Sequence, residues 1–172
     1  VDYWTQNELH ALVNTEPGSF AARFQALHGP CISAMGWKVR NAHQALQEAL
    51  ARGATAVRDG DYFRHGERVP AILGIGDSVI YLLDDEAPAP QRYASMGFRA
   101  HPQPKSVPQK GFLRIDHLTN NVPAGSMAKV ANFYKQVFGF EEVRYFDIRG
   151  KQTGLVSYAL RSPCGSFCIP IN

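Results

Sequence analysis

The feature of this sequence that most constrains its fold is an internal repeat. Residues 31–84 and residues 111–172 each predict a strand, a helix and three further strands, in that order. Both predicted helices carry apolar residues at helical spacing and end at a glycine, Gly53 in the first copy and Gly139 in the second. The repeat predicts an α+β fold of βαβββ units, with mixed, curved sheets and flanking helices.

The predicted elements extend beyond these two copies. Two strands and a helix ahead of the first copy predict a partial unit over 1–30. We expect an N-terminal domain at 1–84, formed by the partial unit and the unit 31–84, then a linker at 85–110 and the first unit of a C-terminal domain at 111–172. Helices are expected at Pro17–His28, after Asn41 and after Ser126. Strands are expected at Val1–Thr5, Leu9–Asn14, Cys31–Val39, Thr55–Asp59, Val69–Gly74, Ser78–Asp84, Arg114–Val122, Glu141–Ile148, Thr153–Arg161 and Ser166–Asn172, with turns at Gly76-Asp77 and Arg149-Gly150.

The segment 85–110 differs in composition from the rest of the chain. Its prolines can neither continue a helix nor donate to a strand ladder, which predicts a linker: Pro88, Pro90, Pro102, Pro104 and Pro108. Tyr93, Met96 and Phe98 in its middle are apolar enough for part of it to pack. The chain begins with Val1 instead of methionine and both domains lack elements of complete units, so we expect polypeptide to be missing at both ends.

Composition excludes several classes of protein. The formal net charge of +3 is spread over the sequence, whereas nucleic-acid binding needs clustered basic residues. No apolar run approaches the roughly 20 residues that span a bilayer, so we expect no membrane partner. Three cysteines without a C-x-x-C pair predict reduced thiols in a cytoplasmic protein. Cys164 and Cys168 flank a turn and allow a metal site, but buried structural cysteines are the favoured interpretation.

His117 is the residue at which the two copies differ chemically. Ala34 occupies the corresponding position of the first copy, so only the second copy offers an imidazole there. The adjacent Asp116 is expected on the opposite face of the predicted strand, which excludes a catalytic dyad. His117 is then either a scaffold residue or a metal ligand. The other histidines are interpreted as scaffold, because they lie in a hairpin, in or beside helices, or in loops: His10, His28, His43, His65 and His101.

An iron(II) oxygenase site of the non-haem type takes two histidines and one carboxylate. The final predicted strand, Ser166–Asn172, contains no carboxylate, and no other histidine repeats the Ile-x-His pattern around His117. These residues therefore offer one ligand of the three.

Specific motifs follow the linker: Ile115-Asp116-His117-Leu118-Thr119-Asn120-Asn121-Val122, Ala131-Asn132-Phe133-Tyr134, Phe138-Gly139-Phe140, Arg144–Gly150, Thr153–Ser157 and Ile169-Pro170-Ile171-Asn172. Further runs precede it: Asn14-Thr15-Glu16-Pro17, His28-Gly29-Pro30 and Pro70–Gly76. Together they cover essentially the whole chain and resemble the 4-hydroxyphenylpyruvate dioxygenase family. That family belongs to the vicinal oxygen chelate, or glyoxalase-like, superfamily, which is built from βαβββ units.

The resemblance implies an iron(II) enzyme in which His117 is the first metal ligand. The second histidine and a glutamate would come from a further unit beyond Asn172, so the 172 residues alone are expected to be inactive. The implied reaction converts 4-hydroxyphenylpyruvate and O₂ to homogentisate and CO₂ in tyrosine and phenylalanine catabolism. The implied partners are this small 2-oxo acid, O₂ and further copies of the chain in a cytoplasmic homo-oligomer.

The same motifs imply substrate-binding residues. Ser157 and Asn172 are expected as polar groups on the substrate side of the pocket, with hydrogen bonding at strand ends as the alternative. Thr119 is expected to share the strand face of His117, and Pro170 that of Asn172. Tyr145, Phe146 and Asp147 match the family but are interpreted as core and turn residues.

Two other functions stay open. A hydroxymandelate synthase uses the same substrate and metal but oxidises the benzylic carbon, and the residues that redirect oxidation are expected beyond Asn172. A non-catalytic protein of the same superfamily would bind a small molecule between paired units. The incomplete units at both ends argue against that second function.

Overall fold

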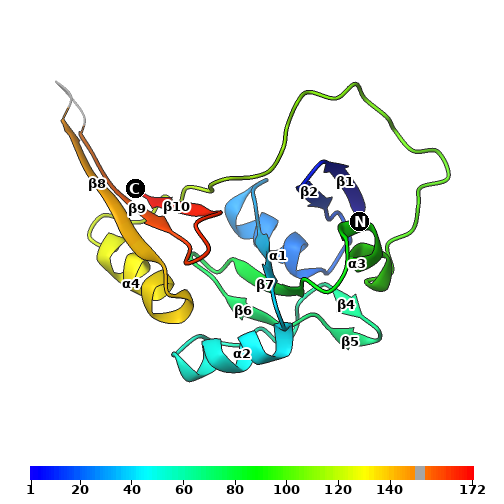
Figure 1. Ribbon diagram of the computed structural model, residues 1–172, viewed down its shortest axis with the longest axis horizontal. Helices are drawn as coiled ribbons and strands as arrows, with labels where there is room; N and C mark the ends of the chain where they lie inside the picture. Colours follow the sequence, from blue (N-terminus) through cyan, green and yellow to red (C-terminus); the bar gives the residue numbers. More distant parts are fainter. Residues whose placement is uncertain (150–153) are drawn as a thin grey trace. The chain divides into compact units, whose positions relative to one another are not determined.

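The computed structural model describes the backbone of residues 1–149 and 154–172, and the side chains of residues 1–143 and 157–172 (Figure 1). Two compact units divide the chain, Val1–Arg114 and Ile115–Asn172. The predicted turn at Arg149-Gly150 and the first residue of the strand predicted from Thr153 involve residues outside this description. Within the described residues, no helix combines the length and the apolar character needed to cross a bilayer.

The first unit is built around β7 (Val79–Asp84), which lies between β3 (Ala34–Val39) and β6 (Ala71–Leu73). β3 runs parallel to β7 and β6 runs antiparallel to it. The first four residues of β7 are all buried, as expected for a central strand covered on both faces. Helix α2 (Ala42–Ala51) contacts this strand.

The second unit has the strand order β10-β9-β8 and is covered by α4 (Met127–Phe138), which contacts β9 and β10 (Figure 1). Its strands are β8 (Glu141–Arg149), β9 (Gly154–Arg161) and β10 (Cys168–Ile171). Gly139 ends α4 in a left-handed conformation, with φ of 70°, as the sequence predicts.

The strand predicted at Arg114–Val122 is wrong as a continuous element. The segment forms isolated parallel bridges to β10, from His117 to Cys168 and from Asn120 to Ile171. Pro170 lies between the two bridged positions of β10 and has no N–H, so the ladder is interrupted there. The segment nevertheless runs alongside β10 and parallel to it, as the βαβββ order requires.

The two units therefore repeat one topology. In each unit the first segment runs parallel to the last strand, which then pairs antiparallel with the strand before it. Ala34 pairs with Val79, the first residue of β7, and His117 pairs with Cys168, the first residue of β10. The structure thus gives Ala34 and His117 the same place in the topology, as the sequence repeat predicts.

Two predictions in the first unit require correction. The strand expected at Thr55–Asp59 is reduced to one bridge between Ala56 and Ile72. A short hairpin that was not predicted follows, formed by β4 (Phe63–Arg64) and β5 (Glu67–Arg68). Its turn is made by His65 and Gly66, which both have positive φ, as a tight hairpin turn requires.

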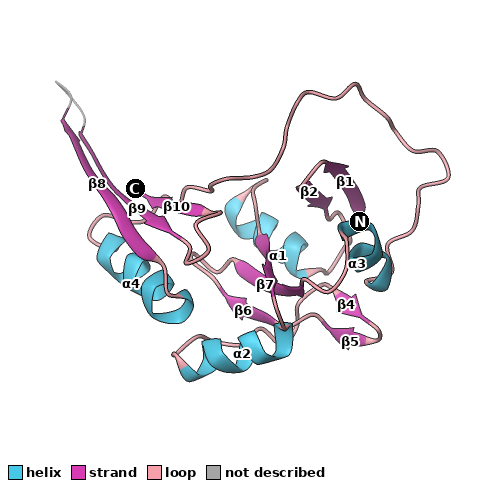
Figure 2. Cartoon of the chain, in the orientation of Figure 1, coloured by secondary structure: helices cyan, strands magenta, loops and turns pink. Residues whose placement is uncertain are grey.

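The N-terminal hairpin forms as predicted, from β1 (Asp2–Gln6) and β2 (Leu9–Val13), and α1 (Phe20–His28) follows it. The predicted linker is not without regular structure, because Ala89–Ser95 forms α3. Tyr93 of α3 is buried and stacks on Tyr3 of the hairpin, with 4.3 Å between ring centroids. Residues 99–113 form a loop (Figure 2). The domain boundaries expected from the sequence stay a prediction.

Candidate functional site

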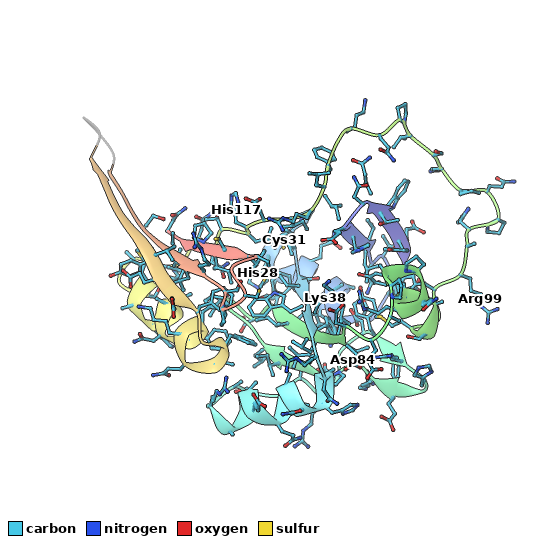
Figure 3. All side chains as sticks on the ribbon, in the orientation of Figure 1. His28, Cys31, Lys38, Asp84, Arg99 and His117 are labelled. Atoms are coloured by element: carbon cyan, nitrogen blue, oxygen red, sulfur yellow. The ribbon has the colours of Figure 1, made fainter. Side chains whose placement is uncertain are left out.

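His117 lies on the segment that runs alongside β10 in the second unit (Figure 3). Its side chain is 54% exposed. Residues that pair across a sheet share a face, so His117 is on the face of Cys168. The opposite face belongs to α4, since Asn120 pairs with Ile171 and contacts Tyr134 of α4. The imidazole is therefore presented on the face of the sheet that α4 does not cover.

The predicted substrate residues belong to the same face of the sheet. Thr119 is two residues from His117, while Pro170 and Asn172 alternate with the buried Ile169 and Ile171. The register pairs Ile171 with Tyr158, which brings the buried Ser157 opposite Asn172. The backbone thus groups His117, Thr119, Ser157, Pro170 and Asn172 on one face, and their roles stay predictions.

Asp116 contradicts the prediction that it cannot reach His117. Its Oδ2 lies 3.1 Å from Nδ1 of His117. Both side chains are exposed and lie on a segment with only isolated bridges to β10, so they can turn toward each other across the edge of the segment. The hydrogen bond from His117 lowers the pKa of the Asp116 carboxyl. With Nδ1 engaged by a carboxylate, Nε2 is the ring nitrogen left for a ligand.

The residues present fit an iron site only in part. Across the side chains that the structure describes, no three His, Cys, Asp or Glu groups come together as metal ligands. His117 offers one nitrogen on an open face, while His10 is hydrogen-bonded to Tyr3 and Thr5 in the N-terminal hairpin. His43 is exposed on α2. The described residues thus form no complete three-ligand set, and the role of His117 as a metal ligand stays a prediction.

The interpretation of Cys164 and Cys168 as buried structural residues is wrong for Cys164. Cys31 and Cys164 are exposed, and Cys168 is partly buried. Cys164 Sγ lies 3.3 Å from Ser162 Oγ and 2.9 Å from Ser166 Oγ. These hydrogen bonds, with that of Ser162 the largest cause, lower the pKa of the Cys164 thiol to about 7.

Sequence reasoning missed a polar pair behind the His117 segment. Tyr134 is completely buried in α4, and its hydroxyl donates to Oδ1 of Asn120 at 3.0 Å. Burial raises the pKa of the Tyr134 phenol. The sequence signal was the tyrosine itself, since a buried phenol on an apolar helix face requires a hydrogen-bond partner. Tyr145, Phe146 and Asp147 have side chains outside the described ones.

Family profiles match both parts of the chain. Residues 1–98 match the profile described as hydroxyphenylpyruvate dioxygenase, HPPD, N-terminal. Residues 114–171 match the glyoxalase/bleomycin resistance protein/dioxygenase superfamily. The second match confirms the predicted glyoxalase-like fold.

Individual relatives align along the whole chain. Protein MelA of Shewanella colwelliana is 51% identical, covering 99% of this chain and 48% of the relative. The 4-hydroxyphenylpyruvate dioxygenase of Legionella pneumophila strain Philadelphia 1 is 43% identical, covering 100% of this chain and 47% of the relative. The chain thus spans about half the length of these curated relatives.

Among solved structures, a xylose isomerase-like TIM barrel/4-hydroxyphenylpyruvate dioxygenase fusion protein is similar. It aligns with a TM-score of 0.77 and 28% identity, covering 99% of this chain and 25% of the fusion protein. This similarity agrees with the α+β architecture of repeated units.

Proposed function

Because the chain belongs to the hydroxyphenylpyruvate dioxygenase family, as its motifs predicted, we propose that it is part of an iron(II) enzyme acting on 4-hydroxyphenylpyruvate. The proposed reaction consumes O₂ and forms homogentisate and CO₂, a step of tyrosine and phenylalanine catabolism. One observation carries the proposal: the second unit offers an exposed imidazole where the first unit has Ala34. The first unit is then structural and the second unit carries chemistry.

His117 would hold the metal through Nε2, since its Nδ1 lies against the Asp116 carboxylate. A second histidine and a glutamate would come from polypeptide outside these 172 residues, completing the three-ligand set. When bound, iron(II) supplies the chemistry that activates O₂ and the 2-oxo acid. The chain's own part is to place one nitrogen on an uncovered sheet face.

Ser157 and Asn172 would hold the substrate by hydrogen bonds from the same face, with Thr119 and Pro170 as wall residues. Orienting the ring against the metal in this way lowers the entropic part of the barrier. The backbone of Asn172 already pairs with Asn120 and Val122, and its Nδ2 donates to Asn121 Oδ1 at 3.4 Å. These contacts support the alternative in which Asn172 serves only the sheet. In that case, removing its side chain would leave KM unchanged.

The proposal also includes the cellular location, the small-molecule ligands and the oligomeric state. Three free cysteines support a cytoplasmic location, where thiols stay reduced. The expected ligands are a small 2-oxo acid and O₂, and the homo-oligomer rests on the family resemblance alone. The 172 residues by themselves should be inactive, because they offer one metal ligand.

Oxygen uptake by the full-length protein, measured with iron(II), ascorbate and 4-hydroxyphenylpyruvate, tests the function. We expect O₂ uptake that depends on the substrate and iron, with homogentisate as the product and His43→Ala unchanged, because His43 is exposed on α2. A hydroxymandelate product, or no uptake, would overturn the proposal. Ser157→Ala and Asn172→Ala should each raise KM, and an unchanged KM would assign those side chains to the sheet.

A further inference from the structure

Pro170 creates a gap in the parallel ladder that holds the His117 segment. On one side of it Cys168 N–H donates to Asp116 O at 2.9 Å, and on the other Asn172 N–H donates to Asn120 O at 3.0 Å. The donor between them would be the N–H of residue 170, aimed at Leu118 O, and proline has none. In the first unit Tyr81 has the position of Pro170, and the β3–β7 register is unbroken.

The side chain of Asn120 reaches the carbonyl that Pro170 leaves without its ladder donor. Asn120 Nδ2 donates to Leu118 O at 3.4 Å, and Asn120 Oδ1 accepts from the buried Tyr134 hydroxyl at 3.0 Å. A carbonyl can only accept, so the orientation of the amide is fixed. The backbone N–H of Asn120 also donates to Pro170 O at 2.9 Å. Asn120 thus links α4, the His117 segment and β10.

We propose that Asn120 and Tyr134 are positioning residues for His117. The Asn120 amide, held by the Tyr134 hydroxyl, substitutes for the N–H that Pro170 lacks and keeps Leu118, the next residue after His117, aligned on β10. The inference rests on the proposed function, because the placement of His117 affects metal binding only if His117 is a ligand.

Hydrogen exchange in the Tyr134→Phe variant of the full-length protein tests the positioning directly. The variant removes one hydroxyl, so we expect the Leu118 and Asn120 amides to exchange about fivefold faster, the factor for one net hydrogen bond. Tyr93→Phe is the matched control, since Tyr93 is also a buried helix tyrosine but belongs to the other unit, and it should leave these amides unchanged. No acceleration in Tyr134→Phe would overturn the proposal.

Pro170→Ala provides an independent arm, because it restores the missing N–H. In that background Tyr134→Phe should accelerate exchange less than about twofold, and an undiminished fivefold effect would overturn the proposal. Tyr134→Phe should also weaken iron(II) binding, by up to the same factor of about five, whereas unchanged binding with faster exchange would contradict the positioning role. Iron retention in His117→Ala would instead refute His117 as the ligand. Hydrogen exchange of the Leu118 and Asn120 amides in Tyr134→Phe would still show whether Asn120 holds the segment on β10.

Discussion

Replacing Asp61 by alanine should lower the free energy of unfolding of the unit Val1–Arg114 by about 3 kcal/mol. Asp61 joins the start of α1 to the rest of the unit: its Oδ1 accepts from Phe20 N at 2.6 Å and its Oδ2 from Ala21 N at 3.0 Å. Asn14 Nδ2 donates to the same Oδ2 at 3.0 Å. These bonds satisfy two of the N–H groups that the first turn of a helix leaves without partners.

The magnitude follows from the three bonds. Each helix-capping bond contributes about 1 kcal/mol, and the bond from Asn14 about as much again. Helix α1 has 9 residues, a length at which a helix depends on caps and packing for its stability. Asp61→Asn should lose about 1 kcal/mol, because its amide nitrogen replaces one of the two acceptor oxygens.

Urea unfolding followed by tryptophan fluorescence measures this loss in the right unit. The chain has 2 tryptophans, Trp4 and Trp37, and both belong to Val1–Arg114. Asp59→Ala is the matched control: its carboxylate pairs with Arg23 at 2.6 Å, but both side chains are exposed, so the loss should stay within about 0.5 kcal/mol. Equal losses for Asp61→Ala and Asp59→Ala would refute the capping role.

Further predictions concern two titrating groups. Burial, and then the charge of Arg92, lower the pKa of His10 below 6.5, so its contribution to stability should be present above pH 6.5 and be lost as the pH falls through its folded-state pKa. Between pH 8 and pH about 5, the free energy of unfolding should fall less in His10→Gln than in the unsubstituted protein. An identical fall in both proteins would contradict this assignment. Cys164, with a pKa of about 7, should react with iodoacetamide at neutral pH as a partly ionised thiol. Ser162→Ala removes the hydrogen bond that contributes most to the lowered pKa of Cys164 and should slow that reaction. An unchanged rate would contradict this cause of the lowered pKa.

The sequence predicted the helix ends and turns whose conformation is set by neighbouring residues. Gly139 marks the end of α4 and Gly76-Asp77 the turn before β7, and both glycines have the positive φ that this requires. The hairpin at His65-Gly66 had a signal of the same kind, a residue followed by glycine between two short runs. It was missed because its strands are only two residues long.

The segment after β7 was misjudged because proline has two roles. Pro88 is the N-cap residue of α3, and Pro90 lies in its first turn, where a missing N–H costs nothing. The aromatic residues that follow pack on the N-terminal hairpin, a long-range contact that periodicity cannot show. Composition alone therefore favoured a linker where the chain forms a helix.

The candidate site was predictable in its central residue but not in its geometry. Comparison of the two copies was enough to single out His117 against Ala34. The contact with Asp116 was not foreseen, because it depends on an irregular segment whose ladder is broken at Pro170. A proline inside a paired strand was the available signal, and its structural consequence involves Asn120 and Tyr134.

Iron(II) binding by the full-length protein, compared between the unsubstituted protein and His117→Ala, tests the central claim most directly. One iron per chain is expected in the unsubstituted protein and in His43→Ala, whose imidazole is exposed on α2. His117→Ala should lose the metal, because two remaining ligands hold iron(II) weakly. Stoichiometric iron in His117→Ala would contradict the assignment of this imidazole as a ligand.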